Sequence, residues 1–212
     1  MLDLNLFPTV IAVDYIDLAD CLKTIFKYAE RNPSKTNDKS PQLRHYQRST
    51  QADAQILDNQ QLRSLKSQIE SQANKYYHDI LGFHGDLYIT DSWLNICEPG
   101  GYQPDHYHAN SVVSGTVYII ITEAHPKLEF RNPRLMSVPQ CGEIKTEVAQ
   151  ITAYNSGFMS VGNIQNGSVI YWPSYLVHGY GANQADLDRV SISFNLNTKS
   201  SRFLYHNPFT LV

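Results

Sequence analysis

The sequence predicts an α+β domain in which two helices come first and an antiparallel β structure, closed or built from two sheets, follows. Apolar residues recur with helical spacing up to residue 81, and from residue 88 onward short β-rich runs alternate with Gly, Pro and Asn. The length of 212 residues, with 42% hydrophobic residues and no evident linker, suits one sizeable core. We therefore expect a single domain over residues 1–212, in which 1–85 form a mainly helical support and 86–200 form the β core.

Two helices are expected in the first part of the chain. The first lies within residues 14–32, where apolar residues follow a helical spacing until Pro33. Residues 34–53 are polar and irregular, which predicts a surface loop. The second helix is expected over residues 58–81, with Leu62 and Leu65 facing inward and Gly82 at the point where a helix commonly stops.

The second part of the chain is expected to be a succession of short strands. The predicted strands are 88–97, 105–108, 114–122, 128–130, 143–149, 158–161, 168–172 and 190–196. In the last of them, which Arg189 precedes, polar residues occupy odd positions and apolar residues occupy even positions. Because strand side chains alternate between faces, the apolar face is expected to pack on the helices and the polar face to line a cavity.

Composition excludes several classes of protein. A net charge of −3 gives no electrostatic footprint for nucleic acid. The sequence contains no run of about 18 apolar residues, so no transmembrane helix is expected, and Asp3 stands where a secretory signal would carry basic charge. The three cysteines, Cys21, Cys97 and Cys141, follow no disulfide pattern and indicate a reducing compartment. We expect a cytoplasmic protein without a membrane partner.

Three histidines are candidates for a metal site. His106 and His108 stand at positions i and i+2 of a predicted strand, so their imidazoles project from one face and can share one ion. The third ligand is expected from a distant strand, and His178 is the candidate. Three neutral imidazoles suit iron, zinc, copper or nickel, so the ligands alone do not choose the metal. Asp105 and Tyr107 point to the opposite face, where Tyr107 is expected to pack.

A cation follows the third histidine in the sequence. Arg189 beside a metal is electrostatically unfavourable unless an anion lies between them. Ser191 shares the face of Arg189, and the planar guanidinium fork together with a hydroxyl is well suited to hold a carboxylate. We interpret the pair as the site of a cosubstrate carboxylate. The alternative is a surface arginine that forms an ion pair with Asp186 or Asp188.

Two further residues are candidates for ligand contact. Asn95 is a polar residue within a strand and needs a partner, which can be a cavity ligand or a backbone group. Trp93, on the same face, is expected in the core. Tyr118 shares its face with Ser114 and Thr116 and can point its hydroxyl into the same cavity.

The spaced motifs together resemble a known family. They are Leu6-Phe7-Pro8-Thr9, Trp93-Leu94-Asn95, Pro99-Gly100-Gly101, His106-Tyr107-His108, Ser114-Gly115, Tyr118, Pro173-Ser174, His178 and the run from Arg189 to Asn195. In these motifs the chain resembles the 2-oxoglutarate/Fe(II)-dependent oxygenases related to prolyl hydroxylases, over most of its length and chiefly over residues 88–195. The resemblance implies a double-stranded β-helix (a jelly roll, as in cupins) with the N-terminal helices packed on one sheet.

The resemblance also implies an activity. Such a protein is an Fe(II)- and 2-oxoglutarate-dependent dioxygenase that consumes O2, releases succinate and CO2, and hydroxylates a small-molecule or peptidyl substrate. The implied metal ligands are His106, His108 and His178, and the implied cosubstrate contacts are Arg189, Ser191, Asn95 and Tyr118. Most of the wider superfamily carries His-x-Asp or His-x-Glu, whereas this chain has His108 at the acidic position. The implied triad therefore has one negative charge fewer.

Two other classes of function fit the same residues. A cupin-type dioxygenase with three-histidine iron, such as a thiol dioxygenase, needs no 2-oxoglutarate, and there Arg189 would bind the carboxylate of the substrate itself. A non-catalytic metal-binding barrel is the other alternative. The substrate is expected to be selected by loops 34–53 and 131–150, whose sequences name no substrate class.

Overall fold

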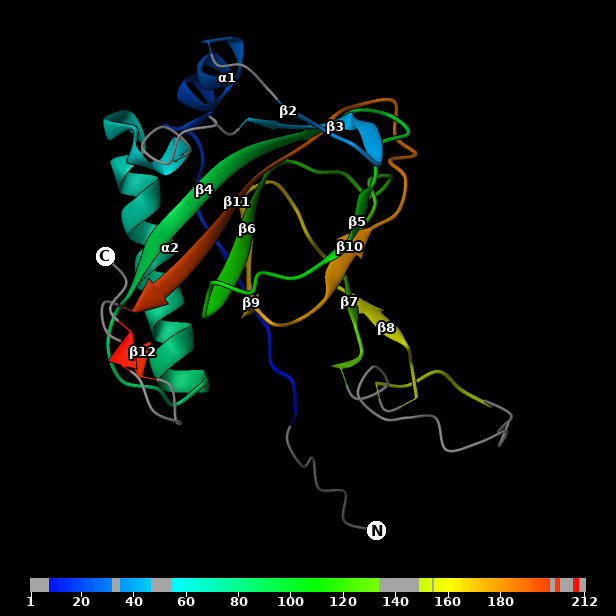
Figure 1. Ribbon diagram of the computed structural model, residues 1–212. Coiled ribbons are helices and arrows are strands. Elements are labelled where there is room, and N and C mark those ends of the chain that lie inside the picture. Colours follow the sequence, from blue (N-terminus) through cyan, green and yellow to red (C-terminus); the bar gives the residue numbers. More distant parts are fainter. Residues whose placement is uncertain are drawn as a thin grey trace.

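The structure, a computed structural model, describes residues 8–31, 35–46, 55–133, 149–153, 155–198, 201–202 and 208–209. Within these residues, seven strands form one antiparallel sheet and four form a second (Figure 1). The larger sheet has the order β1 (Ala12–Tyr15), β9 (Ser168–Pro173), β6 (Val113–Ile120), β11 (Arg189–Thr198), β4 (Leu87–Cys97), β3 (Ser40–Tyr46) and β2 (Lys35–Asn37). The smaller sheet has the order β5 (Gln103–His106), β10 (His178–Tyr180), β7 (Glu129–Arg131) and β8 (Phe158–Ser160). A separate short pair joins β12 (Ser201–Arg202) to β13 (Pro208–Phe209).

The helices cover one face of the larger sheet. They are α1 (Leu22–Arg31), the 3-10 turns η1 (Ile56–Asp58) and η2 (Gln60–Leu62), α2 (Arg63–Lys75) and the π-helical turn η3 (Tyr76–Ile80). Figure 1 shows α2 running beside β4 and β11, away from the smaller sheet. Gly82, with a φ of 73°, follows the last helical turn, because glycine adopts this backbone conformation without steric cost. The predicted second helix is confirmed.

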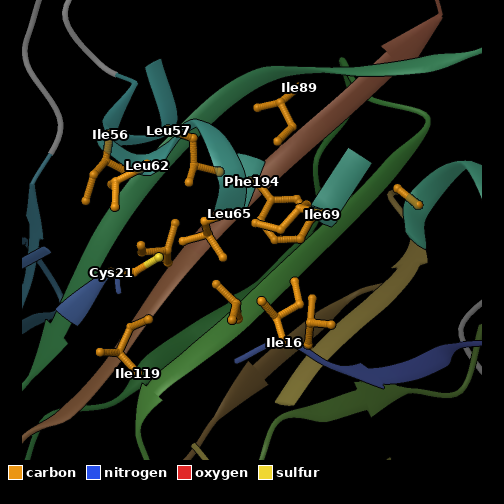
Figure 2. Close-up of a cluster of buried hydrophobic side chains, with 14 of the residues drawn as sticks. Ile16, Cys21, Ile56, Leu57, Leu62, Leu65, Ile69, Ile89, Ile119 and Phe194 are labelled. Atoms are coloured by element: carbon orange, nitrogen blue, oxygen red, sulfur yellow. The ribbon is translucent and has the colours of Figure 1, made fainter. Parts of the chain in front are cut away.

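The main hydrophobic core lies between α2 and the larger sheet. Leu65 and Ile69 of α2 pack in one buried cluster with Ile192 and Phe194 of β11, and all four are fully buried (Figure 2). Each such side chain stabilises the fold by about 1.5–3 kcal/mol relative to exposure. The even-numbered face of β11 therefore packs on the helices, as its alternation predicts.

A second buried cluster lies between the two sheets. It joins Tyr118 and Trp172 of the larger sheet to Phe130 and Tyr180 of the smaller one. The two sheets are thus held face to face by side chains from both. The cavity described below opens beside this cluster, so the site is built on two packed sheets rather than on surface loops.

Two expectations for the N-terminal part are wrong. The predicted helix 14–32 begins only at Leu22, because Asp14 and Tyr15 belong to β1 and pair with Val169 and Ser168 of β9. Edge pairing with β9 outweighs the helical spacing of the apolar residues, since strand formation depends on the neighbouring strand more than on intrinsic preference.

The predicted loop 34–53 is the second error. Its residues 35–46 contain the hairpin β2–β3, in which β3 pairs with β4 and β2 is the edge strand of the larger sheet. Leu43 is the one deeply buried apolar side chain among the described residues of this segment. A strand is recognised in a sequence by several apolar residues at alternate positions, and this segment has too few of them.

The predicted strands of the β region agree with the structure to within a few residues at their ends. The strand predicted at 105–108 is shifted by two residues, because β5 spans Gln103–His106, so His108 lies outside it. The short strand β10 contains His178, which was expected on a distant strand, although no strand range was predicted there. The predicted strand 143–149 lies, except for Ala149, outside the described residues. Within the described part of the chain, no helix has the length and apolar character needed to cross a membrane.

Gly115 permits the close packing of the core against the cavity wall. A Cβ atom at this position of β6 would overlap the Phe194 ring and lie 2.8 Å from the backbone oxygen of Ile170. We expect Gly115→Ala to lower the free energy of unfolding by about 1–3 kcal/mol, the usual cost of overpacking. The measurement is urea denaturation. Gly162→Ala is the control, because a Cβ there meets no atom within 4 Å, and an equal effect of the two substitutions would contradict the prediction.

Candidate metal and cosubstrate site

The three predicted histidines lie together at one end of the smaller sheet. His106, at the end of β5, pairs directly with His178, at the start of β10, and His108 follows two residues after β5. One ring nitrogen from each histidine lies within 4.8 Å of the others. The ring centroids are 4.3 Å apart for His106 and His178, 5.1 Å for His106 and His108, and 5.3 Å for His108 and His178.

Backbone carbonyls fix which nitrogen of two histidines is available. The Nδ1 atom of His106 lies 2.9 Å from the oxygen of Pro104, and that of His178 lies 2.8 Å from the oxygen of Leu176. A carbonyl oxygen only accepts, so both Nδ1 atoms carry hydrogen, and in the neutral imidazole Nε2 is then the nitrogen with a free lone pair. The amide of Gln103 is a more distant neighbour of His106 Nδ1, at 3.5 Å. Orientation of a ligand imidazole by a carbonyl is the usual second shell of a metal site.

Burial favours the neutral form of two of the three rings. It lowers the pKa of His178 to about 3 and that of His108 to about 4, and the nearby His106 lowers both pKa values further. Since a metal binds the deprotonated imidazole, no proton has to leave these two rings at neutral pH before an ion can bind.

We expect the metal-free protein to lose stability as the pH falls. The unfolded chain takes up a proton at His178 near its ordinary pKa of 6.5, whereas the folded chain does so only near pH 3. Stability is therefore complete above about pH 6.5 and decreases below it, by about 2 kcal/mol between pH 7 and pH 5 for His178. Urea denaturation at both pH values measures this loss. It should be smaller by about that amount in His178→Gln, and an equal loss in both proteins would contradict the prediction.

A cavity of about 220 Å³ lies beside the histidines, and we call it the inner cavity. Its walls include all three histidines and the odd-numbered residues Arg189, Ser191 and Ser193 of β11. The polar face of β11 therefore lines a cavity, as its alternation predicts. Ser191 is 2% exposed, so the cavity reaches into the interior of the barrel.

Arg189 is buried in the wall of the inner cavity. It is 2% exposed, and its guanidinium carbon lies 4.9 Å and 4.1 Å from the ring centroids of Tyr118 and Tyr180. Its Nη2 donates to the hydroxyl of Tyr118 at 3.2 Å. Among the described residues no carboxylate forms an ion pair with Arg189. The alternative, a surface arginine paired with Asp186 or Asp188, is therefore wrong.

Two buried donors in the wall of the inner cavity have no acceptor. Within the described residues, neither Nε of Arg189 nor Nε1 of Trp172 has a hydrogen-bond partner. A buried unsatisfied donor costs about 1–3 kcal/mol, and more when it is charged. The inner cavity is therefore matched to a ligand that consists of acceptor oxygens, which is the chemistry of a dicarboxylate such as 2-oxoglutarate.

The two remaining predicted contacts lie in the same row of the sheet. Asn95 pairs with Ser191, and Ser191 pairs with Tyr118 on its other side. Asn95 lines the inner cavity, but its amide is already engaged, donating to Ser193 at 2.9 Å and accepting from His45 at 2.6 Å. Tyr118 is fully buried and does not line the cavity, but its ring packs against the guanidinium of Arg189.

His45 is a cavity residue that sequence reasoning missed, because it lies in the segment predicted as a loop. It stands on β3 directly opposite Asn95 and completes the same row. Burial lowers its pKa, and its Nδ1 donates to the oxygen of Asn95. Its Nε2 is then left as an acceptor at the cavity wall. The only sequence signal would have been Leu43 and His45 on alternate positions, which is too short to predict a strand.

Other sequence-predicted residues lie as follows. Asp105 forms a bidentate pair with Arg131, with contacts of 2.6 Å and 3.0 Å, and is not part of the histidine cluster. Trp93, expected in the core, is only half-buried and lines the inner cavity. Tyr107, expected to pack, is 59% exposed, because the chain leaves the sheet after His106. Most of loop 131–150 lies outside the described residues.

Comparisons with known proteins agree with this geometry. Residues 91–195 match the family model described as "Putative 2OG-Fe(II) oxygenase". This range contains all three histidines, Arg189 and Ser191. A comparison with curated protein sequences found no significant match.

Solved structures share the fold. The epimerase SnoN from nogalamycin biosynthesis, described as non-heme and alpha ketoglutarate dependent, superimposes with a TM-score of 0.65 at 14% identity, covering 91% of this chain and 77% of its own. HygX from Streptomyces hygroscopicus, solved with nickel, 2-oxoglutarate and hygromycin B bound, gives 0.59 at 12% identity and covers 90% and 83%. A prolyl-4-hydroxylase from Pseudomonas putida gives 0.54 at 10% identity and covers 90% and 93%.

These similarities confirm the predicted double-stranded β-helix with helices packed on one sheet. Residues 91–195 therefore match the 2OG-Fe(II) oxygenase family model, and the chain shares the fold of the solved structures named above.

Proposed function

We propose that the protein is an Fe(II)- and 2-oxoglutarate-dependent dioxygenase that consumes O2, releases succinate and CO2, and hydroxylates a small-molecule or peptidyl substrate. The observation that carries the proposal is a buried arginine that has no carboxylate partner within the described residues and lines the same cavity as three clustered histidines. Neither feature stabilises the fold by itself, since a buried unpaired charge costs free energy. Together they suit a metal ion and a dianionic ligand that bridges metal and arginine.

His106, His108 and His178 would hold the metal through their Nε2 atoms or, for His108, through either nitrogen. Bound iron supplies the activation of O2 that the side chains themselves lack. Three imidazoles leave the full 2+ charge of the ion uncompensated by the protein. An anionic ligand in the inner cavity is therefore favoured more strongly than in a site where a carboxylate ligates the metal.

Arg189 and Ser191 would bind the far carboxylate of 2-oxoglutarate. Packing between the rings of Tyr118 and Tyr180 restricts the guanidinium, so its fork is oriented before the ligand arrives. Tyr118 receives one N–H of Arg189 and leaves the buried Nε for the ligand. The indole of Trp172, whose ring centroid lies 4.8 Å from that of the His178 imidazole, offers a further donor on the metal side that has no partner within the described residues.

The experiment measures succinate. Purified protein is loaded with Fe(II) under anaerobic conditions, mixed with 2-oxoglutarate and exposed to O2. We expect slow succinate formation even without the organic substrate, and none when the metal is removed by a chelator. If the protein makes no succinate but oxidises small thiols, the three-histidine dioxygenase without 2-oxoglutarate is the correct function. If it binds iron tightly and oxidises nothing, the non-catalytic barrel is correct.

The cellular location is also a proposal. Cys21 and Cys97 are both buried and free, and neither is placed for a disulfide within the described residues. Unpaired buried thiols support a reducing compartment, and we propose the cytoplasm.

A further inference from the structure

A second cavity of about 390 Å³ lies beside the inner cavity, and we call it the outer groove. The two share Trp93 and His108, whose ring centroids are 5.8 Å apart. The outer groove therefore reaches one of the three clustered histidines from the side away from Arg189. A ligand in it would lie next to the metal site without entering the space that the cosubstrate would fill.

The two cavities are consecutive parts of one polar strip. On β4 the residues Asp91, Trp93 and Asn95 share a face because side chains alternate along a strand. On β11, Asn195 pairs with Asp91 at the outer end, while Ser191 pairs with Asn95 at the inner end. The strip therefore runs from Asp91 in the outer groove to the neighbourhood of Arg189 in the inner cavity.

The outer groove has acidic and aromatic chemistry. Among the described residues that line it there is one carboxylate, Asp91, and no lysine or arginine. Asp91 accepts a hydrogen bond from Thr90 at 3.1 Å and forms no ion pair within the described part of the chain. The indole of Trp93 and the exposed ring of Tyr107 form its apolar walls.

This arrangement sorts ligands by charge. Arg189 attracts a dianion to the inner end of the strip, and Asp91 repels one from the outer end. A carboxylate beside two aromatic faces is the chemistry that holds an ammonium or guanidinium group, since a cation is attracted both by the carboxylate and by the π face of a ring. Side-chain amides such as that of Asn195 add neutral hydrogen-bonding groups for other polar atoms of the ligand.

We propose that the outer groove binds the organic substrate, and that this substrate presents an ammonium or guanidinium group to Asp91 between Trp93 and Tyr107. The proposal rests on the function proposed above, in which the inner cavity holds 2-oxoglutarate. The cation belongs either to a free amine or to a basic side chain of a peptide, because both offer the same chemistry to the groove.

The test uses three probes that share an N-acetylated amino acid amide backbone and differ in the side chain. N-acetyl-lysinamide carries one ammonium, N-acetyl-norleucinamide ends in a methyl group, and N-acetyl-glutamic acid amide ends in a carboxylate. Binding to the Zn(II)-loaded protein, with and without 2-oxoglutarate, is followed through the indole N–H signal of Trp93 by NMR. We expect the lysine derivative to bind about tenfold more tightly than the other two, because only its ammonium group can contact both the carboxylate of the exposed Asp91 and an aromatic face.

Substitution locates the contact. Asp91→Asn should reduce the affinity for N-acetyl-lysinamide about tenfold and leave that for N-acetyl-norleucinamide unchanged. Asp86→Asn removes a carboxylate that does not line the groove and should change neither affinity. Pentylamine, which lacks the peptide groups, separates the two sources of the cation, because a free amine as substrate predicts tighter binding of pentylamine than of the lysine derivative.

Several results would overturn the proposal. These are no binding of the lysine derivative, equal binding of the neutral or acidic probe, or unchanged binding in Asp91→Asn. Failure of the proposed function is a separate result. If the lysine derivative binds as expected while the Fe(II) protein forms no succinate, the outer groove is a cation site and the oxygenase function is wrong.

Discussion

His178→Ala will lose tight Fe(II) binding and will form no succinate from 2-oxoglutarate. His178 is one of three nitrogen ligands, and within the described residues no other histidine, cysteine, aspartate or glutamate joins the cluster to replace it. Alteration of groups that merely orient a ligand commonly costs 10–100-fold in metal affinity, so removal of a ligand should cost more than about 100-fold. Metal titration and a succinate assay measure the two effects.

The control is His84→Ala, which removes an exposed histidine far from the cluster in the sequence and should change neither quantity. His178 is 3% exposed, so His178→Ala also leaves a cavity, and circular dichroism must show that the variant is folded. Succinate formation that persists in folded His178→Ala would show that the activity comes from iron bound elsewhere.

Arg189→Lys will weaken binding of 2-oxoglutarate by about tenfold to several hundredfold. The guanidinium offers a planar fork of N–H groups, and an ammonium cannot reproduce two parallel contacts to one carboxylate. Loss of one charge-assisted hydrogen bond is worth about 1.5–3 kcal/mol. Lysine also gives up the planar packing between Tyr118 and Tyr180, so the charge is positioned less well.

Calorimetry on the Zn(II)-loaded protein measures the affinity of 2-oxoglutarate. Arg63→Lys, at an exposed position on α2, is the control for the exchange of arginine by lysine and should leave the affinity unchanged. Metal affinity should be the same in all three proteins, since Arg189 is not a ligand. An unchanged affinity of Arg189→Lys for 2-oxoglutarate would mean that the arginine has another partner.

Much of the site could be predicted because its residues follow the periodicity of strands. The alternation from Arg189 to Asn195 predicts both the helix-facing side of β11 and its cavity-facing side, and both are found. The spacing of His106 and His108 predicts that both project from one face of a strand. In the structure β5 ends at His106, and His108 reaches the cluster from the segment that follows the strand. The pairing that brings His178 opposite His106 comes from a short strand that no local pattern revealed.

The residues that were missed or misplaced share a physical cause. His45 reaches the inner cavity because β3 pairs with β4 and lies between β4 and β2, and the mainly polar sequence of β3 does not distinguish a strand from a loop. Trp93 and Tyr107 were expected in packed positions, but both border the outer groove. Whether a large aromatic residue fills the core or a cavity wall depends on which elements cover it, and that is a property of the assembled sheets.

The sequence by itself determined the class of fold, the candidate histidines and the shared face of Arg189 and Ser191, because these depend on local periodicity and on the chemistry of single residue types. Only the tertiary structure brought His178 opposite His106. It also decided that Arg189 is buried between two tyrosines and that, within the described residues, Arg189 has no carboxylate partner and its Nε and the indole of Trp172 lack acceptors. Tertiary structure likewise placed Asp91 at the opposite end of the polar strip. Burial and the absence of a partner arise from residues far apart in the chain, and no local pattern carries that information.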